Sequence, residues 1–340
     1  MKITSKNLIF LSVLILATIL ILYKSRKEVS AYQSVDGLIF GTIYHINYQS
    51  EEELKPAIDQ LLQDFNHSLS PFDSTSVISK VNRNEDVELD DYFITIFNRS
   101  MEISELTDGA FDITVSPFVN AWGFGFQNEV FPDSTTIDSL LAFTGYEKIE
   151  LNSENEIVKK DPRITLNASA IAKGYAVDII ADFLTSKGIE NFMVEIGGEI
   201  ITKGVNANKE NWRIGINKPV EDSLSIKGDL QLILELKDNA VATSGNYRNY
   251  YYRDGIRYAH TIDPRTGYPV QHEILSATIV APDCMTADAI ATSCMVMGLD
   301  RSKNLLNSLA GVEGCIIYLN ENGEIVEFFT DGMRESVLRK

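Results

Sequence analysis

Apolar side chains recur at helical spacing in several long segments of the chain. Recurrence every three or four positions predicts an amphipathic helix. Gly188 directly follows one such segment, as is typical of a helix C-terminus. Residues 68–79 are polar and turn-rich, and residues 120–133 are rich in Gly and Phe, which predicts an irregular loop. Helices are predicted over residues 51–66, 91–106 and 169–187, with a helix pair over residues 286–310.

Between these helices, alternating or short apolar runs predict strands. Residues 37–48 alternate as one strand, and residues 192–201 form a strand interrupted by Gly197-Gly198. Asn322-Gly323 predicts a closing hairpin. Further strand-like runs cover residues 149–164, 212–216, 230–236, 240–243, 257–262, 275–280, 316–318 and 325–329. Because helices and strands do not alternate regularly, the pattern indicates an α+β fold with mixed sheets and packed helices.

The first thirty residues form a segment of their own. Lys2 and Lys6 precede an apolar run over residues 8–23, and three more basic residues follow it. This run is short for a membrane-spanning helix, which needs about 20 residues. An uncleaved anchor and a removed signal segment both fit it. We therefore expect one N-terminal apolar helix within residues 1–30, followed by a single domain over residues 31–340.

Composition indicates a folded, acidic protein. Of the 340 residues, 44% are hydrophobic and 23% are charged, so the chain can bury a substantial core. A formal net charge of −18 disfavours nucleic acid as a partner. A polyphosphate ligand would need a metal or a local basic pocket to offset the negative electrostatic field of the protein. The three cysteines form no Cys-x-x-Cys pair and the four histidines show no metal-pair spacing, so a structural zinc site is not indicated.

The region over residues 242–269 interleaves polar residues with aromatics and turn formers. His260 closes a strand-like run, and Asp263-Pro264 turns the chain. Polar strand ends and loops of this kind commonly line a functional site. A hairpin with a hydrogen-bonded histidine explains the pattern equally well.

Two helix starts carry candidate chemistry. Small residues open the helix over residues 167–176, and Lys173 lies in its first turns, where helix N-terminal N–H groups suit a phosphate. In the other helix Thr286 is a candidate N-cap, and Asp288 and Thr292 share one face. Such hard oxygen ligands suit magnesium. Ordinary helix packing and an Asp favoured by the helix dipole explain these patterns without a ligand.

Residues 108–117 place an aromatic side chain beside a carboxylate, directly after a predicted helix stop. An aromatic side chain could stack on a planar ring, but core packing also explains this pattern. The chain contains no Gly-x-Ser-x-Gly elbow, no Walker A loop and no strand-linked Gly-x-Gly-x-x-Gly. Serine hydrolases of that type and ordinary nucleotide-binding folds are therefore not indicated.

Seven stretches, taken together and in order, resemble the ApbE family of FAD:protein FMN transferases. The resemblance spans residues 37–330 and implies an ApbE-like, T-fold-like domain. Each stretch is weak singly, but seven in register are highly specific. They are FGT at residues 40–42, DGAFD at 108–112, AIAKG at 170–174, EIGGE at 195–199, ATSGNYRNY at 242–250, HTIDP at 260–264 and ADAIAT at 287–292.

The resemblance implies a Mg²⁺-dependent enzyme that transfers FMN from FAD to a Thr or Ser hydroxyl of a target protein and releases AMP. Implied acceptors are proteins of membrane electron-transport complexes that carry a flavinylation motif. We expect the chain at the bacterial inner membrane, with its catalytic domain on the periplasmic or extracytoplasmic side. Two other activities fit the same pocket, namely an FAD pyrophosphatase that yields FMN and AMP and a non-catalytic flavin-binding protein.

The resemblance also implies roles for individual residues. Asn167 and Lys173 would contact FAD near its ribose and phosphates, and His260 and Thr261 would lie by the pyrophosphate. Asp288 and Thr292 would hold Mg²⁺ together with the backbone carbonyl of Ala170. As catalytic residues the resemblance suggests Asp288 and His260, the latter as the base for the acceptor hydroxyl. The flavin pocket would be lined by Phe40, Phe72, Ala110, Phe111 and Asp112.

Three positions depart from the family pattern. Asn167 stands where an Asp is common, and Ser169 stands where a Gly is common. Some members have a second carboxylate at the position of Ala291. The asparagine keeps the hydrogen-bonding shape but loses a charge, and the metal would have fewer carboxylate ligands and more waters.

Overall fold

The computed structural model describes residues 14–15, 17–18, 31–125, 131–219, 230–246, 250–253 and 256–338. Nearly all of the predicted N-terminal helix within residues 1–30 lies outside these ranges. Among the described residues, no helix has both the length and the apolar character needed to cross a bilayer. The division of the chain at residue 30 therefore stays a prediction.

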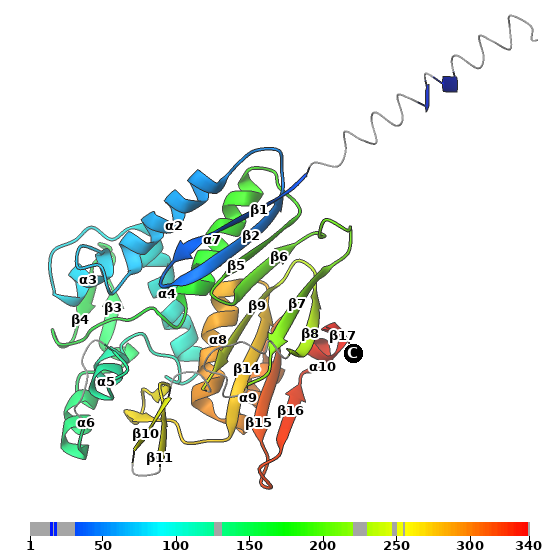
Figure 1. Cartoon of the computed structure of the whole chain (residues 1–340). Helices are drawn as coiled ribbons and strands as arrows, with labels where there is room; N and C mark the ends of the chain where they lie inside the picture. The colour runs from blue at the N-terminus through cyan, green and yellow to red at the C-terminus, as the bar shows by residue number, and fades with distance from the viewer. Residues whose placement is uncertain are drawn as a thin grey trace, which may run out of the picture.

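An eight-stranded sheet forms the centre of the molecule, as Figure 1 shows. All neighbouring strands in it are antiparallel. This arrangement confirms the α+β class. The strand order is β1 (Tyr32–Ile39), β2 (Thr42–Gln49), β5 (Phe192–Ile196), β6 (Glu199–Lys203), β9 (Ala240–Gly245), β14 (Ile274–Ala281), β15 (Glu313–Leu319) and β16 (Ile325–Phe329).

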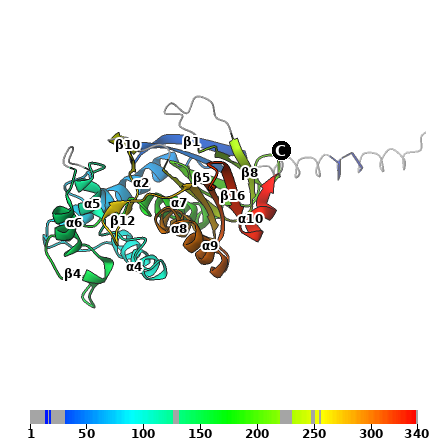
Figure 2. The same ribbon diagram turned by 90° about the horizontal axis from the view of Figure 1, so that it is seen from below.

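Three helices cover one face of this sheet, namely α7 (Ala172–Ser186), α8 (Cys284–Met297) and α9 (Leu299–Ser308) (Figures 1 and 2). Successive residues of a strand point to opposite faces. Ala240 and Ala242 accordingly join the large core, whereas Val241 joins a second core. The central strands are therefore buried on both faces.

The second core includes a three-stranded sheet and a short helix near the C-terminus. The strands are β7 (Trp212–Asn217), β8 (Leu230–Leu236) and β17 (Val337–Leu338), and the helix is α10 (Asp331–Ser336). Its buried side chains include Leu234 from β8. This unit covers the second face of the central sheet.

The remaining elements surround the helical layer. α2 (Lys55–Leu69) and α4 (Asp91–Leu106) add to the large core, and Asp90 caps α4 by accepting the Phe93 N–H at 2.8 Å. A third small core joins α5 (Ser116–Ala121) and α6 (Ser134–Leu141) to β12 (Ile262–Asp263). The smaller elements are α3 (Val77–Asn82), α5 (Ser116–Ala121), α6 (Ser134–Leu141), β3 (Ile149–Leu151), β4 (Ile157–Lys159), β10 (Tyr250–Arg253), β11 (Ile256–Ala259), β12 (Ile262–Asp263) and β13 (Tyr268–Pro269).

The structure corrects several predicted elements. Residues 37–48 are not one strand, because β1 and β2 meet at a turn where Phe40 and Gly41 have φ of 53° and 73°. The predicted strand over residues 257–262 is broken at His260, which lies between β11 and β12. Three short helices lie within or beside the segments described as turn-rich or irregular, and they are α3, α5 and α6. The closing hairpin of β15 and β16 is confirmed.

Candidate active site

A cavity of about 860 Å³ lies where α7 and α8 begin. This volume lies within the range typical of cofactor sites. Its walls come from distant parts of the sequence, including the turn between β5 and β6, the end of β9 and the loop after β11. Predicted site residues on these walls are Ala110, Phe111, Asp112, Asn167, Ala170, Lys173, His260, Thr261, Asp288 and Thr292.

Asp288 and Thr292 lie one helical turn apart on α8 and both line the cavity, as their spacing predicts. Asp288 is only 3% exposed, and its Oδ2 accepts the backbone N–H of Gly174 at 3.1 Å. The hydroxyl of Thr292 lies 3.2 Å from the Ser244 hydroxyl. Burial raises the pKa of Asp288, and the nearby charge of Lys173 opposes this shift.

The N-cap of α8 differs from the sequence prediction. Asp283, and not Thr286, is the N-cap, and its Oδ1 accepts the Thr286 N–H at 2.8 Å. The hydroxyl of Thr286 donates to the same carboxylate oxygen at 2.6 Å. Asp and Thr are both favoured as N-caps, because both have short side chains with a hydrogen-bonding oxygen. The sequence alone therefore does not show which of Asp283 and Thr286 caps the helix.

Helices α7 and α8 approach closely because residue 174 is a glycine. A Cβ at Gly174 would lie 2.3 Å from the Cys284 carbonyl oxygen and 2.9 Å from Cβ of Asp288. Asp178, one turn further along α7, accepts the backbone N–H groups of Cys284 and Met285 at 2.8 Å each. Burial raises the pKa of Asp178 to about 7. These contacts fix the start of α8 against α7.

The carbonyl of Ala170 lies just before α7, whose N-cap is Ile171. The first N–H groups of a helix have no intrahelical acceptor. One of them, the N–H of Gly174, donates to Asp288 Oδ2. Ala170 also lines the cavity, so its carbonyl suits a hard cation beside Asp288 and Thr292. The residues present therefore fit a magnesium site of two side chains and one backbone oxygen.

Asn167 shapes the segment that leads into α7. Its N–H donates to the Ile113 carbonyl at 2.7 Å, and its Oδ1 accepts the Ser169 N–H at 2.9 Å. The side chain therefore closes a local turn at the cavity wall. The structure places it in the lining, where the resemblance puts an FAD contact.

Lys173 pairs with Glu199, a cavity residue to which the sequence analysis gave no role. The Lys173 Nζ lies 2.5 Å from Glu199 Oε1, and Glu199 is 4% exposed. Burial alone lowers the pKa of Lys173, but the carboxylates of Asp288 and Glu199 outweigh it and raise the pKa overall. Burial raises the pKa of Glu199, and the charge of Asp288 adds to this. The short distance to the ammonium favours the ionised pair.

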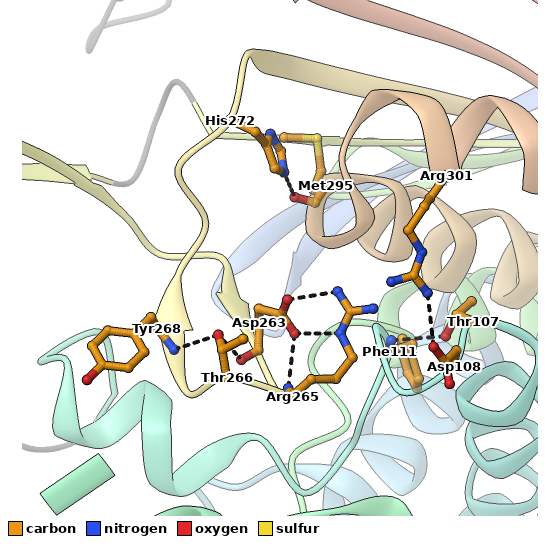
Figure 3. A network of polar contacts seen from close by, with 10 residues as sticks. All are labelled: Thr107, Asp108, Phe111, Asp263, Arg265, Thr266, Tyr268, His272, Met295 and Arg301. Atoms are coloured by element: carbon orange, nitrogen blue, oxygen red, sulfur yellow. Dashed lines mark hydrogen bonds and ion pairs between the residues drawn. The ribbon is translucent and has the colours of Figure 1, made fainter. Parts of the chain in front are cut away.

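The predicted flavin-side residues Ala110, Phe111 and Asp112 are all buried and line the cavity. The Phe111 N–H donates to the Thr107 hydroxyl at 3.1 Å, a bond drawn in Figure 3. Asp112 accepts the N–H of Thr114 at 2.7 Å and that of Tyr146 at 2.8 Å. Burial raises the pKa of Asp112 to about 6. These bonds hold the segment rigidly at the wall.

His260 and Thr261 reach the cavity from the loop between β11 and β12. The Thr261 hydroxyl donates to Asn246 Oδ1 at 2.6 Å. The His260 ring lies edge-on to Phe124, with ring centroids 6.4 Å apart. Arg265 braces the following turn through a bidentate pair with Asp263, at 2.8 and 2.7 Å (Figure 3).

Phe40 and Phe72 are the two predicted flavin contacts that do not line the cavity. Phe40 lies at the turn between β1 and β2 and packs edge-on against Phe65, with centroids 5.6 Å apart. Phe72 lies in the loop between α2 and α3 and is 82% exposed. The structure therefore brings ten of the twelve predicted site residues together and leaves these two outside.

Comparison with known proteins gives one consistent result. The family model of the ApbE family matches residues 40–316. An FAD:protein FMN transferase of Vibrio cholerae is 40% identical over 297 residues, which cover 84% of this chain and 87% of that protein. The protein of the same description from Escherichia coli K12 is 32% identical over 298 residues, covering 84% and 83%.

Solved structures agree with these relatives. The flavin transferase ApbE from Vibrio cholerae superposes with a TM-score of 0.80 at 35% identity, covering 90% of this chain and 99% of that one. The ApbE protein from Thermotoga maritima gives 0.79 at 31% identity, covering 91% and 100%. In sequence and fold, the chain belongs to the ApbE family.

Proposed function

We propose that the cavity binds FAD with Mg²⁺ and that its residues move the FMN half of FAD onto a Thr or Ser hydroxyl of another protein. Transfer of FMN from FAD to a protein is the activity named for the relatives, and the agreement in sequence and fold supports it for this chain. The chain is accordingly an FAD:protein FMN transferase.

One observation carries the proposal. Ala170, Asp288 and Thr292 offer oxygen ligands on the same cavity wall as the ammonium of Lys173. Asp288, Thr292 and the Ala170 carbonyl would hold Mg²⁺, which supplies Lewis-acid stabilisation of charge on phosphate oxygens. Lys173 adds a fixed positive charge for the same purpose. An acidic protein thus gains a local site for a pyrophosphate.

The reaction also needs a proton acceptor. The acceptor oxygen forms a bond to the FMN phosphorus, the bond between that phosphorus and the bridging oxygen breaks, and AMP leaves. His260 lines the cavity and is the residue that would take the hydroxyl proton. We expect His260→Ala to bind FAD normally and to lose most of its transfer rate. Transfer at the wild-type rate would remove His260 from this role.

The central test uses FAD, Mg²⁺ and a peptide that carries an acceptor threonine, with a peptide carrying alanine there as the control. Mass spectrometry should find covalent FMN on the threonine peptide alone, with one AMP released per FMN attached. Free FMN and AMP without covalent flavin would instead identify an FAD pyrophosphatase. Bound FAD without AMP release would identify a flavin-binding protein.

We further propose that the chain acts at the bacterial inner membrane, on the periplasmic or extracytoplasmic side, with proteins of electron-transport complexes as acceptors. The apolar run over residues 8–23 and the implied acceptors support this location. The test is fractionation of cells that express the full chain, followed by protease treatment of spheroplasts. Recovery in the cytosolic fraction, or protection from protease, would contradict the proposal.

A further inference from the structure

The turn that carries Glu199 places a carboxylate deep in the cavity. Gly197 and Gly198 have φ of 65° and 104°, values that glycine adopts without strain. A Cβ at Gly197 would lie 2.9 Å from Thr42 Cγ2 and 3.4 Å from Lys173 Cδ. The two glycines therefore allow β6 to begin beside Lys173, with Glu199 as its first residue.

Within the described ranges, one oxygen of the Glu199 carboxylate has no hydrogen-bond partner. Oε1 pairs with Lys173 at 2.5 Å, but among the described residues nothing hydrogen-bonds to the buried Oε2. A buried carboxylate costs much free energy unless its charge is paired. Among the described residues, the contact with Lys173 is the ion pair of Glu199, and it must offset much of this cost.

Two carboxylates, those of Asp288 and Glu199, lie close to the Lys173 ammonium. Asp288 is close enough for its charge to raise the pKa of Lys173, yet in the described structure the ammonium forms its ion pair with Glu199. Asp288 Oδ2 accepts the Gly174 N–H instead. An ion pair between Lys173 and Asp288 would compete directly with a cation for the Asp288 carboxylate.

We infer that Glu199 is a positioning residue that holds the Lys173 ammonium away from Asp288, so that Asp288 stays available to a divalent cation. The inference rests on the magnesium site of the proposed function. It assigns Glu199 no contact with substrate or metal. Its effect passes through Lys173, and removing Lys173 should therefore abolish it.

Mg²⁺ binding to the full chain, measured by calorimetry without flavin, tests this inference. Glu199→Gln should weaken Mg²⁺ binding about tenfold, because Lys173 is released toward Asp288. In a Lys173→Met background the same substitution should change the affinity less than about twofold. Lys173→Met alone should bind Mg²⁺ more tightly than the wild type, which provides a second measurement if the glutamine variant folds poorly.

Glu199→Asp separates position from charge. The shorter side chain keeps the negative charge but withdraws it by about 1.5 Å. If position matters, this variant should resemble Glu199→Gln. Wild-type Mg²⁺ affinity in Glu199→Asp would overturn the inference, because charge alone would then suffice. Equal weakening by Glu199→Gln with and without Lys173, or no weakening in either, would overturn it as well.

The outcome is separable from that of the proposed function. Wild-type protein that binds Mg²⁺ but transfers no FMN would refute the proposed function, while the comparison of variants would still decide the role of Glu199. Wild-type protein that binds no Mg²⁺ would overturn this inference, and transfer of FMN in metal-free buffer would show that the transferase activity stands without it.

Discussion

Two walls of the cavity are built in different ways. The helical wall, residues 170–174 and 284–292, is held by carboxylates that accept backbone N–H groups, namely the partly buried Asp178 and the buried Asp288. The loop wall, residues 260–268, joins two-residue strands and is braced by the partly exposed pair of Arg265 and Asp263. The helical wall would thus give fixed geometry to the proposed cation and phosphates, whereas the partly exposed loop wall carries His260, where the proposed protein acceptor would enter.

The largest effect is expected at the helical wall itself. Asp288→Asn should lower FMN transfer by about 1000-fold, because the only carboxylate among the proposed metal ligands is lost. Asp300→Asn removes an exposed carboxylate from the neighbouring helix and should leave transfer unchanged. Covalent flavin on the acceptor peptide is the readout. Unimpaired transfer by Asp288→Asn in metal-free buffer would refute the magnesium site.

Gly174→Ala should separate the two helices of that wall. The new methyl group would collide with the Cys284 carbonyl, and such overpacking costs about 1–3 kcal/mol of unfolding free energy. Asp182→Ala, at an exposed position of the same helix, is the matched control. Urea unfolding measures the loss of stability, and Mg²⁺ titration shows whether the site opens. Wild-type stability would mean that the helices can shift apart freely.

The partly buried carboxylate of Asp178 should make stability depend on pH. Its pKa is raised to about 7 in the folded protein, against about 3.9 in an unfolded chain. Between these values the folded state binds more protons, so this group destabilises the protein as pH rises from about 4 to about 7. Asp178→Asn should therefore flatten the fall in melting temperature over that range. A parallel fall in both proteins would contradict the assignment.

The smallest effect is expected at the loop wall. Arg265→Ala should reduce transfer only a few-fold, because partly exposed ion pairs contribute about 1 kcal/mol or less. Arg163 forms the same two bonds with Asp161, two residues earlier in the chain, and neither residue lines the cavity. Arg163→Ala is therefore the control. A loss as large as that of Asp288→Asn would erase the distinction between the two walls.

Helical periodicity predicts the helical wall well. The sequence does not predict contacts between helices and strands that are far apart along the chain. Spacing alone places Asp288 and Thr292 on one face, and the structure confirms this. The bonds from Cys284 and Met285 to Asp178 join residues more than 100 positions apart, so no local pattern reveals them. The Gly197-Gly198 pair indicates that another part of the chain packs closely beside Glu199. A glycine pair does not identify that part, which the structure shows to be Thr42 and Lys173.

Alternation misleads at the first hairpin for a definite reason. Leu38 pairs with Ile43 across the turn, so the buried positions change from odd numbers in β1, such as Val35, to even numbers in β2, such as Tyr44. The apolar alternation continues through the turn on even numbers, but Leu38, which belongs to it, is 80% exposed. The turn was visible only as a glycine in an apolar run. The placement of Phe40 and Phe72 came from resemblance and not from a local pattern, and the structure leaves both outside the cavity wall.

Only Pro282 and Asp283 connect strand β14 to α8. The pairing of β14 with β9 therefore also sets how α8 is placed on the sheet, and with it the position of Asp288. If β14 shifted by one residue against β9, its side chains would exchange faces of the sheet. The Asp288 carboxylate would then turn away from Thr243 and Ser244. Length changes in this short connection should therefore be rare among functional variants, whereas the exposed tip around Gly323 can absorb them. Strand pairing in the sheet would therefore set the position of Asp288 in the proposed metal site.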